Sequence, residues 1–139
     1  MKLIGEKVLT LTVTVDEPKR VGKTPEGELM IIPITGGKFE GKDLKGKVCP
    51  GGADWNTKID DETAHAFAKY WIETNDGEII SIQNEGIINL KREDAVISTT
   101  PKFQCDLNGK YAFLATDTYV GELKAIAKDC VEITVYKMK

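Results

Sequence analysis

The stretch VCPGGADW, residues 48–55, decides how this chain folds. Proline fixes φ and removes a backbone donor, and the paired glycines reach conformations that other residues avoid. The stretch therefore predicts a constrained corner that brings Asp54 and Trp55 to a defined position. Two interpretations stay open at this point, a corner that only turns the chain and an element of a functional site.

Residues 60–74, which follow this corner, fit two periods. The apolar residues have helical spacing, but residues 64–72 also alternate with period two, as in a strand. The next residues, Asn75-Asp76-Gly77, are typical of a hairpin turn because they tolerate positive φ. Residues 78–84 then alternate clearly. We therefore predict that residues 60–74 form a strand rather than a helix.

The remaining chain is rich in short strands and turns. Residues 3–16 alternate over a long strand, residues 95–100 and 111–116 are strand-like, and residues 119–127 fit either a strand or a short helix. Residues 17–27, with two prolines and two glycines, predict a loop, either a lid or a surface excursion. No alternation of strands and helices is present. The pattern predicts an all-β barrel or sandwich, with residues 1–139 forming one domain.

Composition excludes several classes of protein. The net charge is −3, and the lysines form no basic block, which argues against nucleic-acid binding. No apolar run approaches the ~18–20 residues that a membrane span needs, and the N-terminus lacks the apolar core of a signal peptide. Three distant cysteines without a CxxC motif argue against disulfides and structural zinc. We expect a cytoplasmic protein with no membrane partner.

The chemistry available to this chain is limited. His65 is the one histidine, so a multi-histidine metal site cannot form, and no glycine-rich phosphate motif is present. We expect no metal and no cofactor. Asp54 and Tyr70 are the candidate acid/base pair, because burial in a barrel raises a carboxyl pKa towards working pH. The alternative is a tyrosine hydroxyl bonded to a corner carboxylate for structure. The candidate ligand-binding residues are Trp55, Lys69, Asn84, Thr99 and Tyr111.

Several runs carry a family resemblance: GKVCPGGADW at 46–55, ETNDG at 73–77, NEG at 84–86 and TTPKF at 99–103. Together they resemble a domain-of-unknown-function family of small bacterial and fungal proteins whose members are similar to allene oxide cyclase barrels. The resemblance covers essentially the whole chain, and PGGADW is its most specific motif. It implies a closed antiparallel β-barrel of about eight strands. It also favours strands over helices at residues 63–73 and 119–127, and it implies no general activity.

The chain departs from this family pattern at three positions. Lys69, Glu85 and Ser98 stand where the resemblance implies arginines. If those arginines hold an anion in relatives, this protein would prefer a neutral ligand or use Lys69 alone, because lysine cannot reproduce bidentate arginine contacts.

These observations lead to three hypotheses. The first is a barrel that binds a small neutral molecule; the second is a cofactor-free isomerase or cyclase with Asp54 as acid/base; the third is a structural or oligomerising protein with a filled barrel. An internal cavity of roughly 300 Å³ or more with Asp54 in its wall would favour the first two. Phe67, Trp71 and Val120, on the expected outer face, indicate contacts within a homo-oligomer.

Overall fold

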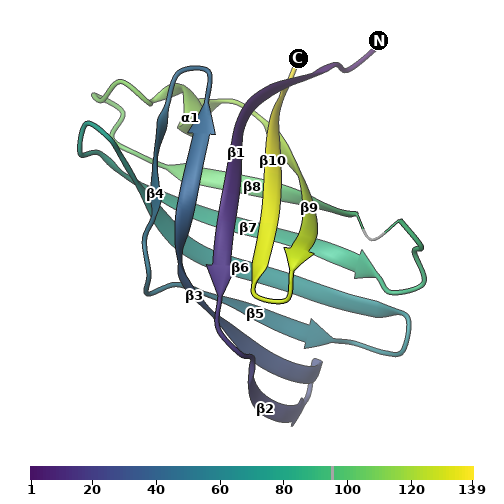
Figure 1. The fold of residues 1–139 in the computed structure, drawn as a ribbon. Helices are drawn as coiled ribbons and strands as arrows, with labels where there is room; N and C mark the ends of the chain where they lie inside the picture. The colour runs from purple at the N-terminus through teal and green to yellow at the C-terminus, as the bar shows by residue number, and fades with distance from the viewer. Residues whose placement is uncertain (95) are drawn as a thin grey trace.

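The chain forms one antiparallel sheet that closes on itself (Figure 1). The computed structural model describes residues 1–94 and 96–139. Its strands are β1 (Gly5–Val15), β2 (Lys19–Thr24), β3 (Gly27–Gly41), β4 (Lys45–Val48), β5 (Ala53–Lys58), β6 (Thr63–Thr74), β7 (Ile79–Asn89), β8 (Ile97–Gln104), β9 (Tyr119–Ala127) and β10 (Cys130–Met138), with one short helix, α1 (Phe113–Thr116).

The barrel closes where β3 pairs with β1. Neighbouring strands run from β1 through β10, β9, β8 and β7 to β6. β6 then pairs with both β4 and β5, which pair with β3 on their other side. Because β4 and β5 follow each other along one stave, the barrel has eight staves. The predicted all-β fold, a closed antiparallel barrel of about eight strands, is confirmed.

The VCPGGADW stretch joins β4 to β5 within that stave. Residues 49–52 stand opposite only Tyr70 and Trp71 of β6, so the chain bulges there. Gly51 has φ +117°, and a Cβ at this position would lie 2.6 Å from the Trp71 ring. A Cβ at Gly52 would overlap the backbone carbonyl of Lys69. The corner therefore needs its two glycines, one for conformation and one for space.

β6 shows why the period-two interpretation prevails over the helical one. Its inner face carries three alanines, at 64, 66 and 68, followed by Tyr70 and Ile72. Its outer face carries the residues between them, and both edges of the strand are hydrogen-bonded to neighbours. A strand lets one face fill the interior while the other meets solvent. The predicted strands at 60–74 and 119–127 are confirmed as β6 and β9.

One end of the barrel is packed solid. Leu9, Ile72 and Ile80 are fully buried there, as is Leu114 of α1, which packs against β8. Beside this plug the Tyr111 hydroxyl donates to Asp76 Oδ1 over 2.8 Å, and Lys110 Nζ lies 3.0 Å from the other carboxylate oxygen. We call this the closed half of the barrel.

Three local predictions need correction. Residues 17–27 are no loop, because β2 pairs with the first half of β3 and Gly22, at φ +117°, absorbs a register shift. Residues 111–116 include the helical turn α1 instead of a strand, since a turn brings both Tyr111 and Leu114 into the barrel end. The strand predicted from residue 95 is β8, which begins at Ile97 and continues past Pro101; Ala95 lies outside the described residues.

Within residues 1–94 and 96–139, no helix has the length and apolar character needed to cross a membrane.

Candidate functional site

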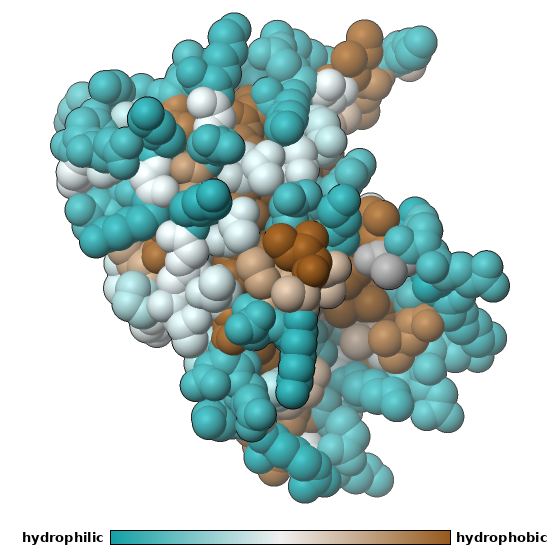
Figure 2. All heavy atoms as spheres, viewed as in Figure 1, coloured by the Kyte–Doolittle hydropathy of each residue, from teal (hydrophilic) through white to brown (hydrophobic). Residues whose placement is uncertain are grey.

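The other half of the barrel contains a cavity of about 340 Å³, and we call it the open half. The cavity exists because the strands place small side chains at this level, among them Ala66, Ala68 and Ala125. Its apolar wall is completed by Val13, Val15, Ile32, Ile34, Ile88, Ile97, Leu123, Val131 and Ile133. Two exposed residues, Asp16 and Lys128, mark the mouth. On the face of the molecule that Figure 2 draws, apolar atoms gather near the centre and right, with hydrophilic atoms around them.

Four adjacent staves contribute polar side chains to this apolar wall, and β5 contributes Asn56 as well as Asp54. Asp54 comes from β5, Tyr70 from β6, Asn84 from β7 and Thr99 from β8. Asp54 and Asn84 are both the register partners of Ala68. They therefore flank this alanine in one row, on strands separated by two spacings of about 4.8 Å. The small Ala68 side chain leaves a recess between the carboxylate and the amide.

Three of these polar groups lack a hydrogen bond within the described part of the chain. The atoms are the Tyr70 hydroxyl, Asn84 Oδ1 and Thr99 Oγ1, and their residues are only 3%, 4% and 3% exposed. A buried polar atom without a partner costs roughly 1–3 kcal/mol, and native structures satisfy nearly all such atoms with protein, water or ligand. Three of them on one cavity wall indicate a site that an incoming molecule completes.

Asp54 is the carboxyl group of the inner wall. Its Oδ1 accepts the backbone N–H of Phe67 over 2.9 Å, and its Oδ2 accepts from the Asn56 side chain over 3.3 Å. Burial raises the pKa of this carboxyl above its ordinary value, although both hydrogen bonds and nearby His65 oppose the shift. Asp54 is thus held in a fixed orientation and binds a proton more readily than an exposed aspartate.

Tyr70 reaches the same cavity but makes no hydrogen bond with Asp54, whose partners are Asn56 and Phe67. The structure therefore lacks the hydrogen bond between the two residues that the structural alternative required, and their acid/base role stays a prediction. Burial raises the pKa of Tyr70 well above its ordinary value of 10.0, so this hydroxyl stays protonated at physiological pH. In this site it is a neutral hydrogen-bond donor.

Three predicted ligand-binding residues lie outside the cavity. Trp55 and Lys69 alternate with the inward Asp54 and Tyr70, so both side chains are on the outer face, with Trp55 43% exposed. Tyr111 lies in the closed half, where its hydroxyl binds Asp76. The period-two alternation of the strands already predicts the outward direction of Trp55 and Lys69. The position of Tyr111 depends on α1, which the strand prediction for residues 111–116 missed.

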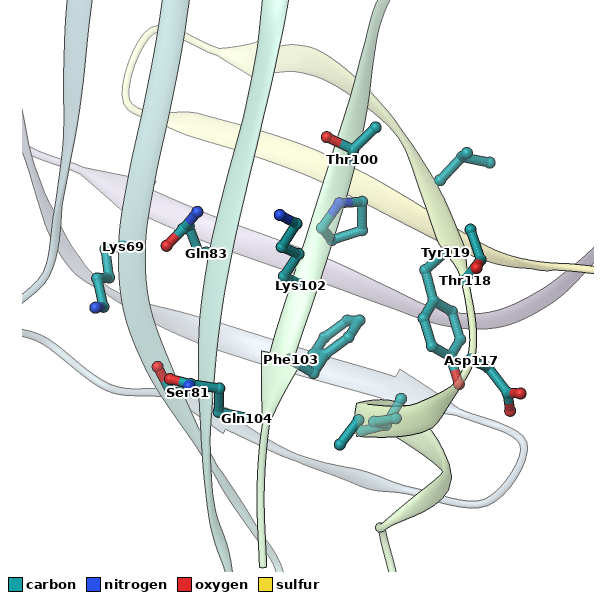
Figure 3. Close-up of a pocket in the computed structure, with 14 residues that line it drawn as sticks. Lys69, Ser81, Gln83, Thr100, Lys102, Phe103, Gln104, Asp117, Thr118 and Tyr119 are labelled. Carbon is teal, nitrogen blue, oxygen red and sulfur yellow. The ribbon is translucent and has the colours of Figure 1, made fainter.

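Lys69 instead borders an external groove of about 530 Å³ (Figure 3). The groove lies where β8 and β9 separate, beyond their last paired residues, Thr99 and Gly121. Phe103 and Tyr119 meet edge to face in this region, with ring centroids 5.4 Å apart. The groove's Lys69, Lys102 and Gln104 are exposed, so water already satisfies their polar groups. The internal cavity is therefore the stronger candidate site.

The positions where the resemblance implied arginines are also external. Residues 69, 85 and 98 alternate with the inward Tyr70, Asn84 and Thr99. They do not set the charge of the cavity, so the earlier argument from these residues for a neutral ligand does not hold. His65 is external too, and its Nε2 lies 2.9 Å from the Glu85 carboxylate.

Two features of the site were not predicted. Asn56 holds the Asp54 carboxylate, and the alanines at 66 and 68 create the space beside it. The sequence signal for this space was the run of alanines on one face of β6, before Tyr70 and Ile72 on the same face. Within the described ranges, no three His, Cys, Asp or Glu side chains gather as metal ligands.

The fold and this site define a small closed β-barrel, packed at one end and hollow at the other. The chain belongs to the family of proteins of unknown function DUF3237, which matches residues 5–138. Among its relatives, the UPF0311 protein CA_C3321 of Clostridium acetobutylicum is 40% identical over 83 residues, which cover 59% of this chain and 52% of that protein. This chain thus matches about half the length of that relative.

Other relatives match over nearly the full length. The UPF0311 protein RPA1785 of Rhodopseudomonas palustris is 31% identical over 145 residues, covering 94% of each chain. Its crystal structure superposes with a TM-score of 0.90 over 100% of this chain and 99% of that one, at 29% identity. A β-barrel-like protein of Acinetobacter baumannii gives 0.89, at 28% identity, over 100% and 98% of the chains. An enzyme of Penicillium herquei, at 20% identity and 0.75 over 97% and 96%, shares the fold.

Proposed function

We propose that this protein binds a small, mostly apolar molecule inside the open half of its barrel. The observation that carries this proposal is the cavity of about 340 Å³, whose wall holds three buried polar atoms without partners among the described residues. Its volume lies within the range of known small-molecule sites, about 300–1,000 Å³. A mostly apolar lining with a few fixed polar groups is also typical of such sites. The hollow half counts against a purely structural barrel with a filled interior.

The test combines a search for a natural ligand with a designed block of the cavity. Native mass spectrometry of the purified protein should show a co-purifying small molecule, and the neutral fluorophore N-phenyl-1-naphthylamine should become brighter on binding. Ala68→Leu places a larger side chain in the recess and should abolish both signals. Ala127→Leu makes the same change at an exposed position and should preserve them. A wild-type protein that takes up neither molecule would refute the proposal.

A second candidate function is a cofactor-free isomerase or cyclase. The observation that favours it is Asp54, a carboxyl that burial pushes towards a higher pKa in the wall of an apolar cavity. Asp54 would transfer the proton, and Tyr70 would only donate a hydrogen bond, because its own pKa is too high for a base. The Penicillium neighbour is an enzyme with the same fold, which makes catalysis on this barrel a reasonable test.

Two measurements separate a catalyst from a binder. The Asp54 carboxyl carbon, followed by NMR against pH, should titrate above its ordinary value of 3.8. Asp54→Asn should retain binding of the co-purified molecule and lose at least about 100-fold of any turnover, the typical contribution of general acid–base catalysis. An unshifted titration, or turnover that survives in Asp54→Asn, would leave the binding function alone.

We also propose a homo-oligomer, through the outer face of β5 and β6. Trp55 lies directly opposite Phe67 in the strand register, and Trp71 is 37% exposed on the same face. Val120 is on β9, three strands from β6, so it does not extend this patch. Sedimentation should show a dimer at micromolar concentration that Trp55→Thr weakens. A monomeric wild type at that concentration would contradict this proposal.

A further inference from the structure

We infer that the ligand is an uncharged molecule with a hydroxyl group, and that this hydroxyl binds in the recess over Ala68 between Tyr70 and Asn84. This inference rests on the proposed binding function and specifies the chemistry of the ligand. Three observations support it: the hydrogen-bonding partners that the buried polar atoms need, the positions of these atoms, and the charges in the cavity wall.

The first argument is the match of donors and acceptors. Asn84 Oδ1 only accepts hydrogen bonds, so it needs a donor from the ligand. The hydroxyls of Tyr70 and Thr99 each carry a hydrogen that needs an acceptor. A hydroxyl group donates and accepts through one oxygen and therefore serves both sides. An ether or ketone accepts only, and it would leave Asn84 Oδ1 buried without a partner.

The second argument is position. Asn84 is the register partner of Ala68, and Tyr70 is the next inward residue on the same strand as Ala68. Their side chains thus rise on two sides of the recess that the alanine methyl leaves open. Asp54 borders the recess from β5, but its two oxygens already accept from Phe67 and Asn56. The Tyr70 hydroxyl and Asn84 Oδ1, which have no hydrogen bond, therefore gain more from a ligand hydroxyl than the Asp54 carboxylate does.

The third argument is charge. An anionic ligand would meet Asp54 in the wall, and the one cation among the described lining residues is Lys128, exposed at the mouth. A buried charge without a close partner is costly, so a carboxylate should bind poorly. An ammonium group would lose its hydration in this apolar wall, where both oxygens of Asp54 already accept hydrogen bonds from Phe67 and Asn56. An uncharged ligand avoids both costs.

Bound water sharpens the expected preference. The cavity has room for roughly ten water molecules at about 30 Å³ each. A ligand that displaces such a water without replacing its hydrogen bonds loses affinity. A hydroxyl ligand should therefore bind about tenfold or more tightly than its methyl ether.

The experiment measures dissociation constants for four naphthalenes that differ in one substituent at position 2: hydroxymethyl, methoxymethyl, aminomethyl and carboxylate. Displacement of N-phenyl-1-naphthylamine supplies the signal. The hydroxymethyl compound should bind about tenfold more tightly than each of the others. Tyr70→Phe and Asn84→Leu should reduce its advantage over the methyl ether to within about threefold. Tyr111→Phe, the same change in the closed half, should leave that advantage intact.

Each outcome decides one of the two proposals. If the protein binds the fluorophore but does not favour the hydroxymethyl compound, or if Tyr70→Phe leaves the preference intact, the hydroxyl inference is wrong and the binding function stands. If the aminomethyl compound binds best and Asp54→Asn abolishes this, the ligand is a cation. If neither the fluorophore nor any naphthalene binds, the proposed function itself fails.

Discussion

The closed and open halves of the barrel are built from the same strands but filled differently. β6 passes from three alanines in the open half to Tyr70 and then the fully buried Ile72 in the closed half. Leu9 on β1 and Ile80 on β7 reach into the closed half in the same way. Hydrogen bonding of the backbone holds both halves, so the cavity is a matter of side-chain size alone. The chain can therefore vary its binding site without changing its fold.

The two halves also treat their polar groups differently. In the closed half the Tyr111 hydroxyl is paired with Asp76, which also accepts from Thr74. In the open half the Tyr70 hydroxyl has no partner among the described residues. Paired groups stabilise a fold, whereas unpaired ones cost stability and are typical of sites that bind another molecule. We expect stability to be concentrated in one half and recognition in the other.

The largest difference should come from shortening an isoleucine in each half. Ile72→Ala leaves a new cavity in solid packing and should lower the free energy of unfolding by about 2–5 kcal/mol. Ile88→Ala enlarges a cavity that already exists, so about 1 kcal/mol is expected. Urea unfolding of both variants measures the difference. Equal losses would show that the open half is as tightly packed as the closed one.

This contrast also shows what the sequence could and could not predict. Alternation over residues 64–72 and the Asn75-Asp76-Gly77 turn were enough for β6, and the family resemblance extended them to a closed barrel. The inward direction of Asp54 and Tyr70 follows from the same alternation, as does the outward direction of Trp55 and Lys69. The alternation of side chains along a strand is a local property, so it can be read from the sequence of that strand alone.

The rest depended on contacts between distant segments. The β2 strand exists because β3 is long enough to pair with it beyond β1, and α1 exists because the barrel end must be filled. Tyr111 was assigned to the ligand site as a polar residue on a predicted strand, without knowledge of the end of the barrel at which it lies. The recess over Ala68 needs the register of three strands, which the sequence alone does not give.

A matched pair of tyrosine substitutions tests the difference in polar groups. Tyr111→Phe removes a paired hydroxyl and should destabilise the protein by about 1 kcal/mol. Tyr70→Phe removes an unpaired one and should be neutral or stabilising by up to about 1 kcal/mol in the ligand-free protein. Unfolding in urea, without added ligand, gives both values. A clear loss of stability in Tyr70→Phe would mean that its hydroxyl already has a partner.

The smallest effects, and the most specific, concern the two aspartates and pH. Burial raises the pKa of Asp54 in the folded state above its ordinary value of 3.8, whereas hydrogen bonds from Thr74, Lys110 and Tyr111 hold the pKa of Asp76 well below that value. Folded Asp54 thus keeps its proton longer than the unfolded chain does. Its contribution to stability is greatest below pH 3.8 and is lost as the pH rises through the folded pKa. The contribution of Asp76 has the opposite sign, present above pH 3.8 and lost as the pH falls below it.

Asp54→Asn and Asp76→Asn should therefore change the pH dependence of unfolding in opposite directions. Relative to wild type, Asp54→Asn should gain stability as the pH rises from about 4 to 7, because a neutral amide needs no desolvation of charge. Asp76→Asn should be less stable than wild type at pH 7, and this deficit should shrink towards pH 3. Urea unfolding at intervals between pH 3 and 7 measures both differences. Parallel curves for Asp54→Asn and wild type would show that the carboxyl is solvated like a surface group, and that burial does not raise its pKa.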